Sequence, residues 1–88
     1  MKNKFAGIEP VPMAECKRRC LDFGKDQNFL LPASEFAGAI WPDHRMTPQG
    51  AGAAASRVLK ALEREGRAGW RPHYERSESR TRWGWWAR

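Results

Sequence analysis

The sequence predicts an α+β fold that is mainly α-helical, with three helices followed by a two-stranded antiparallel hairpin. Between residues 12 and 65, apolar side chains recur at intervals of three and four in three separate segments, which is the period of an amphipathic helix. After Gly66 the period shortens to two, as in a strand with one face on a core. A chain of 88 residues predicts a single domain, 1–88, with one modest core.

The first helix is expected over residues 12–25, after an extended lead-in over 1–11 that has no clear period. Pro12 suits the first turn, where a missing backbone N–H costs nothing. The apolar face of this helix consists of Met13, Cys16, Cys20 and Phe23. Because both cysteines lie on that face, we expect two buried structural thiols.

A connection over 26–33 leads into a second, shorter helix over 34–41. We expect Phe29 and a following leucine to be buried in this connection. Ser34 is predicted to be the N-cap of the helix. Pro42 ends it, because the residue before a proline disfavours helical geometry. The apolar face of the second helix consists of Phe36, Ala37 and Ile40.

A turn over 42–47 precedes the third and longest helix, predicted over 48–65. Thr47 is a suitable N-cap, Pro48 takes the first helical position, and Gly66 follows as the stop. At 100° per residue, the inward arc holds Ala51, Ala55, Val58, Leu59 and Leu62. The opposite arc holds Gln49, Ala53, Ser56, Arg57, Lys60 and Arg64. This helix therefore has an apolar face and a polar, largely basic one.

Residues 68–87 are predicted to form the hairpin, with a polar, charged tip at 76–81. Two sets of side chains alternate along its first strand: Ala68, Trp70, Pro72 and Tyr74 on one face, and Gly69, Arg71, His73 and Glu75 on the other. Pro72 has no N–H to donate to a ladder, so this strand is expected to have a free edge.

The second strand of the hairpin carries three candidates for a protein interface, Trp83, Trp85 and Trp86. Alternation places Trp83 and Trp85 on one face and Trp86 on the other. Because one hairpin cannot bury both of its faces against three helices, at least one of these indoles should be exposed. An exposed indole can anchor a protein interface, including self-association, or stack on a nucleic-acid base.

The charge of the chain is strongly asymmetric. The formal net charge is +6 and the pI is about 10.0. Residues 1–44 hold six Lys and Arg against six Asp and Glu, whereas residues 45–88 hold the other ten basic residues against four acidic ones. The excess falls on the outer face of the third helix and on the hairpin, which favours a nucleic-acid partner over a merely solvated surface.

Several classes of function find no support in the sequence. It contains no phosphate-binding glycine loop, no convincing catalytic constellation and no apolar run near the ~20 residues of a membrane helix. Cys16 and Cys20, with remote His44 and His73, lack the paired spacing of a zinc site. The basic start has no apolar stretch behind it, as a signal peptide requires. We expect a cytoplasmic protein that is not an enzyme and has no metal, cofactor, membrane or small-molecule substrate.

Two stretches resemble the winged helix-turn-helix family of DNA-binding domains. Residues 31–37, with Ile40, look like the family's second helix, and residues 55–66 look like its third helix running into the stop glycine. Residues 71–85 would form the wing. The compact chain is similar to family members of phage or plasmid type. The resemblance implies a transcriptional regulator that inserts its third helix into the major groove of double-stranded DNA and places its wing on the phosphate backbone.

The resemblance also assigns contacts. Those of the third helix fall on Thr47, Gln49, Ala53, Ser56, Arg57 and Lys60, and Arg64 extends the same basic row. Those of the wing fall on Arg71, His73, Arg76, Arg80 and Arg82. Gln can read an adenine edge and Arg a guanine, while Lys and Arg supply the salt-dependent grip on phosphate.

Other functions remain open at this stage. The third helix begins with Gly and Ala at 50–55, which offer few donors and favour backbone contact or a protein partner over base reading. One alternative is therefore a phage-encoded interaction module or inhibitor, of the anti-CRISPR kind, that binds a host protein through its exposed tryptophans. Another is an assembly role similar to that of a small terminase subunit or a replication accessory protein. The assembly protein would also bind DNA, but as a higher oligomer, whereas a DNA-binding regulator of this family can form a homodimer.

Overall fold

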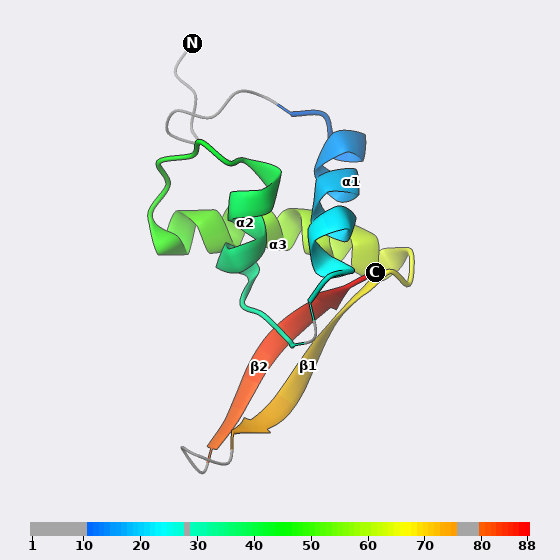
Figure 1. Cartoon of the computed structure of the whole chain (residues 1–88), viewed down its shortest axis with the longest axis vertical. Coiled ribbons are helices and arrows are strands. Elements are labelled where there is room, and N and C mark those ends of the chain that lie inside the picture. Colours follow the sequence, from blue (N-terminus) through cyan, green and yellow to red (C-terminus); the bar gives the residue numbers. More distant parts are fainter. Residues whose placement is uncertain (1–10, 28, 76–79) are drawn as a thin grey trace.

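The computed structural model describes residues 11–27, 29–75 and 80–88 and confirms the predicted fold class (Figure 1). Its elements, in chain order, are α1 (Met13–Gly24), α2 (Ala33–Ile40), α3 (Pro48–Arg64), β1 (Ala68–Glu75) and β2 (Arg80–Ala87). Each helix end lies within one residue of its predicted position.

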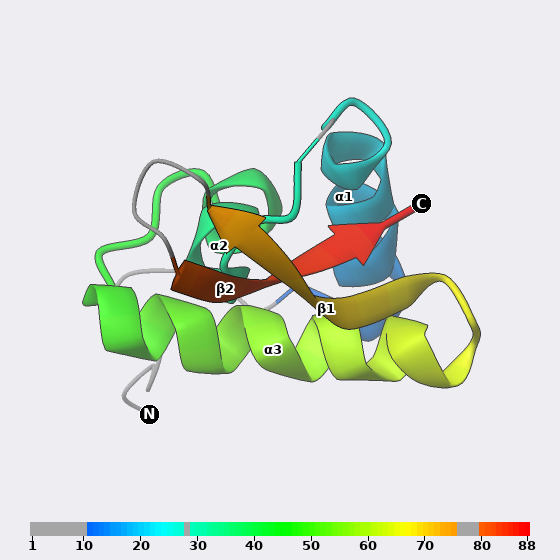
Figure 2. The same ribbon diagram turned by 90° about the horizontal axis from the view of Figure 1, so that it is seen from below.

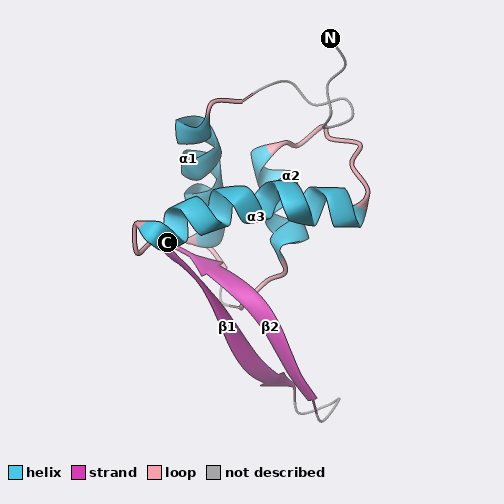
Figure 3. Cartoon of the chain, turned by 180° about the vertical axis from the view of Figure 1, so that it is seen from behind, coloured by secondary structure: helices cyan, strands magenta, loops and turns pink. Residues whose placement is uncertain are grey.

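The three helices form one body, and the hairpin projects from it (Figure 1). Viewed from behind, α3 runs across the front of α1 and α2, and no described element lies in front of it (Figure 3). The hairpin begins beside the C-terminal end of α3 and extends away from the helices, so that the longest dimension of the chain is 46 Å. One side of α3 and most of the hairpin are therefore open to a partner.

Local signals account for both ends of α3. The Thr47 hydroxyl accepts a hydrogen bond of 3.1 Å from the backbone N–H of Gly50, as predicted for the N-cap. At the other end Gly66 takes a φ of 76°, a region in which a side chain is strained. The N–H groups of Gly66 and Arg67 donate to the carbonyls of Glu63 and Leu62, which is the Schellman arrangement.

The start of α2 differs from the prediction. The helix begins at Ala33, directly after Pro32, and no side chain caps it. Ser34 is thus a residue of the first turn and not the N-cap. Pro32 already has extended geometry, with φ −65° and ψ 153°, so the chain enters the helix one residue earlier than the sequence signal suggested.

The core lies where the three helices meet the base of the hairpin. Its largest fully buried side chains are Phe36, Ile40, Leu59, Leu62, Val58 and Cys20. Phe23 of α1 meets Phe36 of α2 edge to face, with ring centroids 5.3 Å apart. Ala68, Trp85 and Ala87 extend the core onto the hairpin. Among the side chains that the structure describes, hydrophobic burial thus joins the sheet to the helices at the base of the hairpin.

The hairpin is antiparallel, with a register that runs from Ala68 opposite Ala87 to Glu75 opposite Arg80. β2 also has a partner on its second edge, because Leu31 donates to the Trp85 carbonyl (3.0 Å) and accepts from the Trp85 N–H (2.7 Å). β1 pairs only with β2 within the described residues. The free edge predicted from Pro72 is confirmed.

The Leu31 bridge also corrects an expectation about the connection between α1 and α2. Phe29 was expected to be buried, but 78% of its surface is exposed. The bridge fixes the backbone of the connection along β2, and Leu30 then lies against Gly84. Leu30 and Leu31 are half-buried there, whereas Phe29 precedes this contact and stays exposed.

Candidate nucleic-acid interface

The outward face of α3 is the predicted one. Its exposed residues include Gln49, Ala53, Arg57, Lys60, Glu63 and Arg64, and Ser56 is half-buried among them. None belongs to the core, which takes the opposite face of the same helix. Because α1 and α2 both lie on one side of α3 (Figure 2 and Figure 3), neither of these helices covers this row of exposed side chains.

Two cations on this face have no acidic partner. No described carboxylate lies within ion-pair distance of Lys60 or Arg64. The two residues are four apart and therefore project from the same side of the helix, one turn from each other. Arg71, near the start of β1, is likewise exposed and has no acidic partner among the described residues. These three side chains keep their positive charge available to a partner.

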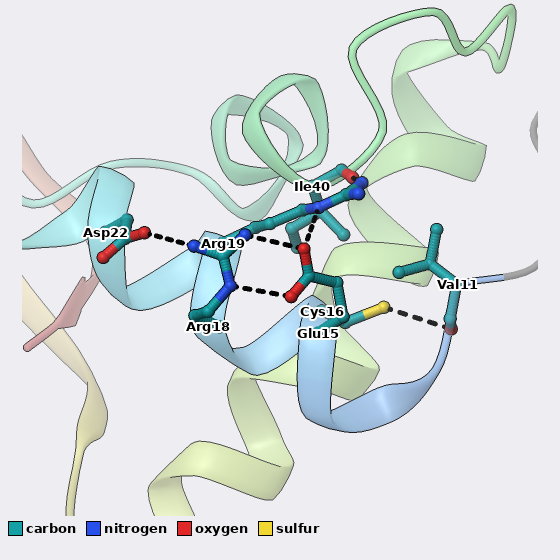
Figure 4. A network of polar contacts seen from close by, with 7 residues as sticks. All are labelled: Val11, Glu15, Cys16, Arg18, Arg19, Asp22 and Ile40. Atoms are coloured by element: carbon teal, nitrogen blue, oxygen red, sulfur yellow. Dashed lines mark hydrogen bonds and ion pairs between the residues drawn. The ribbon is translucent and has the colours of Figure 1, made fainter.

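The cations of α1 contrast with them, because every one is paired. Lys17 binds Glu65 just beyond α3, and Lys25, the residue that follows α1, lies 3.8 Å from Asp22. Arg18 joins Glu15 (2.6 Å) to Asp22 (2.9 Å), as the close view shows (Figure 4). The two halves of the chain thus differ in ion pairing as well as in net charge: the cations near α1 are paired, whereas Lys60, Arg64 and Arg71 have no partner among the described carboxylates.

Glu15 is the centre of the network on α1 (Figure 4). Its carboxylate accepts hydrogen bonds from Arg18 and also from Arg19 Nε, at 3.0 Å. The Arg18 and Arg19 hydrogen bonds lower the pKa of Glu15 from 4.5 to about 2. The carboxylate is therefore ionised at any physiological pH, and α1 presents alternating, compensated charge.

The first turns of α3 are built for packing against α2. Ala51, Ala54 and Ala55 are buried, and a Cβ at Gly52 would make an ordinary contact with the backbone of Ser34. The small residues thus let two helices approach closely. Of the predicted contacts at this end, Thr47 already uses its hydroxyl as the cap, which leaves Gln49 as the polar side chain available to a base.

On the hairpin, the register pairs Arg71 with Gly84, His73 with Arg82 and Glu75 with Arg80. Arg71 is the predicted wing contact whose side chain is described, and it is exposed. The side-chain contacts predicted for His73, Arg80 and Arg82, and residue Arg76 as a whole, lie outside the described part of the chain.

The tryptophans of the hairpin divide between core and surface. Trp85 is 6% exposed and belongs to the core, which removes it from the candidate interface. Trp83 is 52% exposed, so the expectation of at least one exposed indole is confirmed. Trp86 is half-buried on the opposite face of the hairpin, and its ring lies directly over Gly69, where a Cβ would clash with it.

Two exposed side chains near these surfaces were not among the sequence candidates. Trp70 is 40% exposed and stacks on Trp83, with ring centroids 5.8 Å apart. The sequence pattern places Trp70 on one face of its strand. Had the register between the two strands been known, this pattern would have predicted the pair. Arg45, in the turn before α3, is also exposed. Its only signal in the sequence is its charge.

The remaining features of the described residues show no catalytic arrangement. Cys16 and Cys20 are free and buried, and burial raises the pKa of the Cys20 thiol to about 12. No group of metal-ligating side chains gathers in the described ranges. A pocket of about 70 Å³ beside Phe36 and Trp86 is far below the size of a ligand site. None of the helices described is long and apolar enough to cross a membrane.

Comparison with protein-family models, with curated proteins and with solved structures found no match for this chain. The class of protein is therefore defined by its own architecture, an α+β domain of three helices and a C-terminal hairpin.

Proposed function

We propose that this protein binds double-stranded DNA, as a small regulator of the type that the sequence resembles. One observation supports the proposal above the others: Lys60 and Arg64 lie on an exposed helix face, and no carboxylate among the described residues pairs with them. An unpaired cationic row on a protruding helix matches a phosphate backbone, and the major groove admits a helix of this diameter. The neighbouring hairpin, with Arg71, adds a second basic surface.

In this proposal the affinity for DNA comes mainly from electrostatic contacts with the phosphates. Cations that neutralise phosphates release bound counterions, so affinity falls steeply as salt rises. The side chains able to read base edges on α3 are few, because its first turns hold small residues packed on α2. We therefore expect binding to many duplex sequences, with a modest preference contributed by Gln49 and Arg57.

The test is fluorescence anisotropy with a labelled blunt duplex of about 20 base pairs at 50 and 200 mM salt. Affinity should fall at least tenfold between the two conditions. The double variant Lys60→Ala/Arg64→Ala should bind at least tenfold more weakly at 50 mM salt.

The matched control is Arg18→Ala/Lys25→Ala, which removes two positive charges from the compensated surface of α1. It should bind like the parent chain. Equal weakening by both double variants would show that only total charge matters. An absence of duplex binding at 50 mM salt would rule out the proposal.

A further inference from the structure

The hairpin contains a column of three indoles that starts in the core and ends at the surface. Trp85 is buried, and the ring of Trp70 lies 5.4 Å from it. Trp83 continues the column, stacked on Trp70 at 5.8 Å with only 18° between the ring planes. About half of the Trp83 side chain remains open to solvent. A flat aromatic surface is therefore held at a fixed position on the outside of the hairpin.

Backbone pairing fixes this column before any ligand arrives. Trp70 lies opposite Trp85, and Pro72 opposite Trp83, so that all four share one face of the ladder. The two hydrogen bonds between Trp85 and Leu31 hold the inner end of the column on its other side. A rigid indole pair loses little conformational freedom when it binds, which favours its use as a binding surface.

Exposed indole surface of this extent needs a partner to explain it. Each tryptophan carries one of the largest apolar surfaces of any side chain, and a cluster that faces water is typical of a binding site. The partner that fits a stacked indole best is another flat ring presented face-on. The sequence and structure therefore indicate a ligand with an accessible aromatic face.

The charge that the sequence gives to the hairpin segment favours one class among such ligands. Residues 67–88 hold six arginines, no lysine and two glutamates. Arginine is the cation suited to nucleic acids, because its planar head binds phosphate and stacks on rings. A second copy of this chain would bring the same positive hairpin against itself, which is unfavourable. Accessible aromatic rings beside cations are the combination that single-stranded nucleic acid binds.

We propose that the Trp70–Trp83 pair stacks on an unpaired DNA base next to the duplex. This inference rests on the proposed duplex binding, since α3 would hold the duplex while the hairpin reaches the single strand beside it. Bases inside a duplex have both faces covered by their neighbours, so only an unpaired base offers a free face to Trp83. The substrate class is thus a junction between duplex and single-stranded DNA.

The experiment compares the blunt duplex with the same duplex carrying a six-nucleotide thymidine overhang, by anisotropy at 100 mM salt. The parent chain should prefer the overhang by about 5- to 150-fold, the range expected for one stacked base. Trp83→Ala should lose this preference and keep its affinity for the blunt duplex. Trp83→Tyr, which keeps an aromatic ring, should restore most of the preference.

Phe29→Ala is the matched control, because Phe29 is an aromatic residue outside the column that is 78% exposed. It should bind both DNAs like the parent chain. Circular dichroism melting of each variant confirms that the hairpin variants remain folded. A measurement without variants is the quenching of tryptophan fluorescence when an oligothymidine is added to the parent chain, since stacking brings a base against the indoles.

The outcomes separate this inference from the duplex proposal. Equal affinity for the two DNAs, or an overhang preference that survives in Trp83→Ala, would overturn base stacking and leave duplex binding intact. Loss of self-association in Trp83→Ala, with DNA binding unchanged, would identify a second copy as the partner of the column and also overturn it. Trp83-dependent binding of the overhang without binding of the blunt duplex would support stacking and overturn duplex binding.

Discussion

The Arg19 guanidinium on α1 donates a hydrogen bond of 2.7 Å to the carbonyl oxygen of Ile40, the last residue of α2 (Figure 4). The last carbonyls of a helix have no partner within it and carry the negative end of its dipole. The first helix thus supplies the C-terminal cap of the second. Glu15 orients the same side chain through Arg19 Nε.

Removing this cap should destabilise the fold. We expect Arg19→Met, which keeps an apolar stem, to lower the free energy of unfolding by about 1–2 kcal/mol. Arg18→Met removes a neighbouring, exposed arginine that pairs with the Glu15 and Asp22 carboxylates, and should lower the free energy of unfolding clearly less than Arg19→Met does. Urea unfolding of both variants gives the comparison. Equal losses would mean that the bond to Ile40 contributes nothing beyond an exposed ion pair.

The contribution of Glu15 should depend on pH in a defined direction. Hydrogen bonds from Arg18 and Arg19 lower its folded-state pKa from 4.5 to about 2, so the interaction stabilises the folded state fully above pH 4.5. That stabilisation is lost as pH falls from 4.5 through 2, because the carboxylate is protonated first in the unfolded state and only then in the folded state. The melting temperature of Glu15→Gln should lie below that of the parent chain at pH 7, and the difference should shrink steadily as pH falls from 4.5 to 2. A difference that stays constant over this range would contradict the assignment.

Replacing each of two helical glycines by alanine should change the stability of the fold in opposite directions. Gly24, at the end of α1, packs against the end of β2, and a Cβ there would lie 2.9 Å from the Ala87 Cβ. Gly24→Ala should destabilise the fold by about 1–3 kcal/mol, because the strand end must move. Nothing lies within 4 Å of a Cβ at Gly38, so Gly38→Ala should stabilise the fold by about 0.5–1 kcal/mol. Thermal melting of the pair tests both signs together.

The two thiols should be unreactive until the chain unfolds. Cys20 has no exposed surface, and burial raises its pKa to about 12; burial also raises the pKa of Cys16. The thiolate is the species that attacks a disulfide reagent, and it is scarce at pH 8 under these conditions. A thiol–disulfide reagent should therefore label neither cysteine in the native chain and both in guanidinium chloride. Rapid labelling of the native chain would contradict their burial.

The salt dependence of duplex binding should report individual contacts. If Lys60 neutralises one phosphate, Lys60→Gln should reduce the slope of log affinity against log salt by about one. Ala53→Ser, on the same face of α3, leaves the charge unchanged and should leave the slope unchanged. Anisotropy titrations at four salt concentrations measure both slopes. A slope that stays the same in Lys60→Gln would place Lys60 away from the backbone.

Much of the fold could be predicted because its signals are local. Thr47 and Gly66 delimit α3 through a cap and a left-handed backbone, and neither depends on the rest of the chain. The period of the apolar residues likewise assigned the two faces of that helix. Phe29 was misjudged because its burial depends on where Leu31 pairs with β2, a contact between segments more than 50 residues apart.

The sequence by itself determined the order of the elements, the apolar and basic faces of α3, and the concentration of charge in residues 45–88. These follow from short-range spacing and from counting. Only the tertiary structure decided which cations keep their charge free, because pairing such as that of Lys17 with Glu65 joins residues distant in sequence. It also decided which indoles are exposed: the register and the Leu31 bridge bury Trp85 and leave Trp70 and Trp83 stacked at the surface.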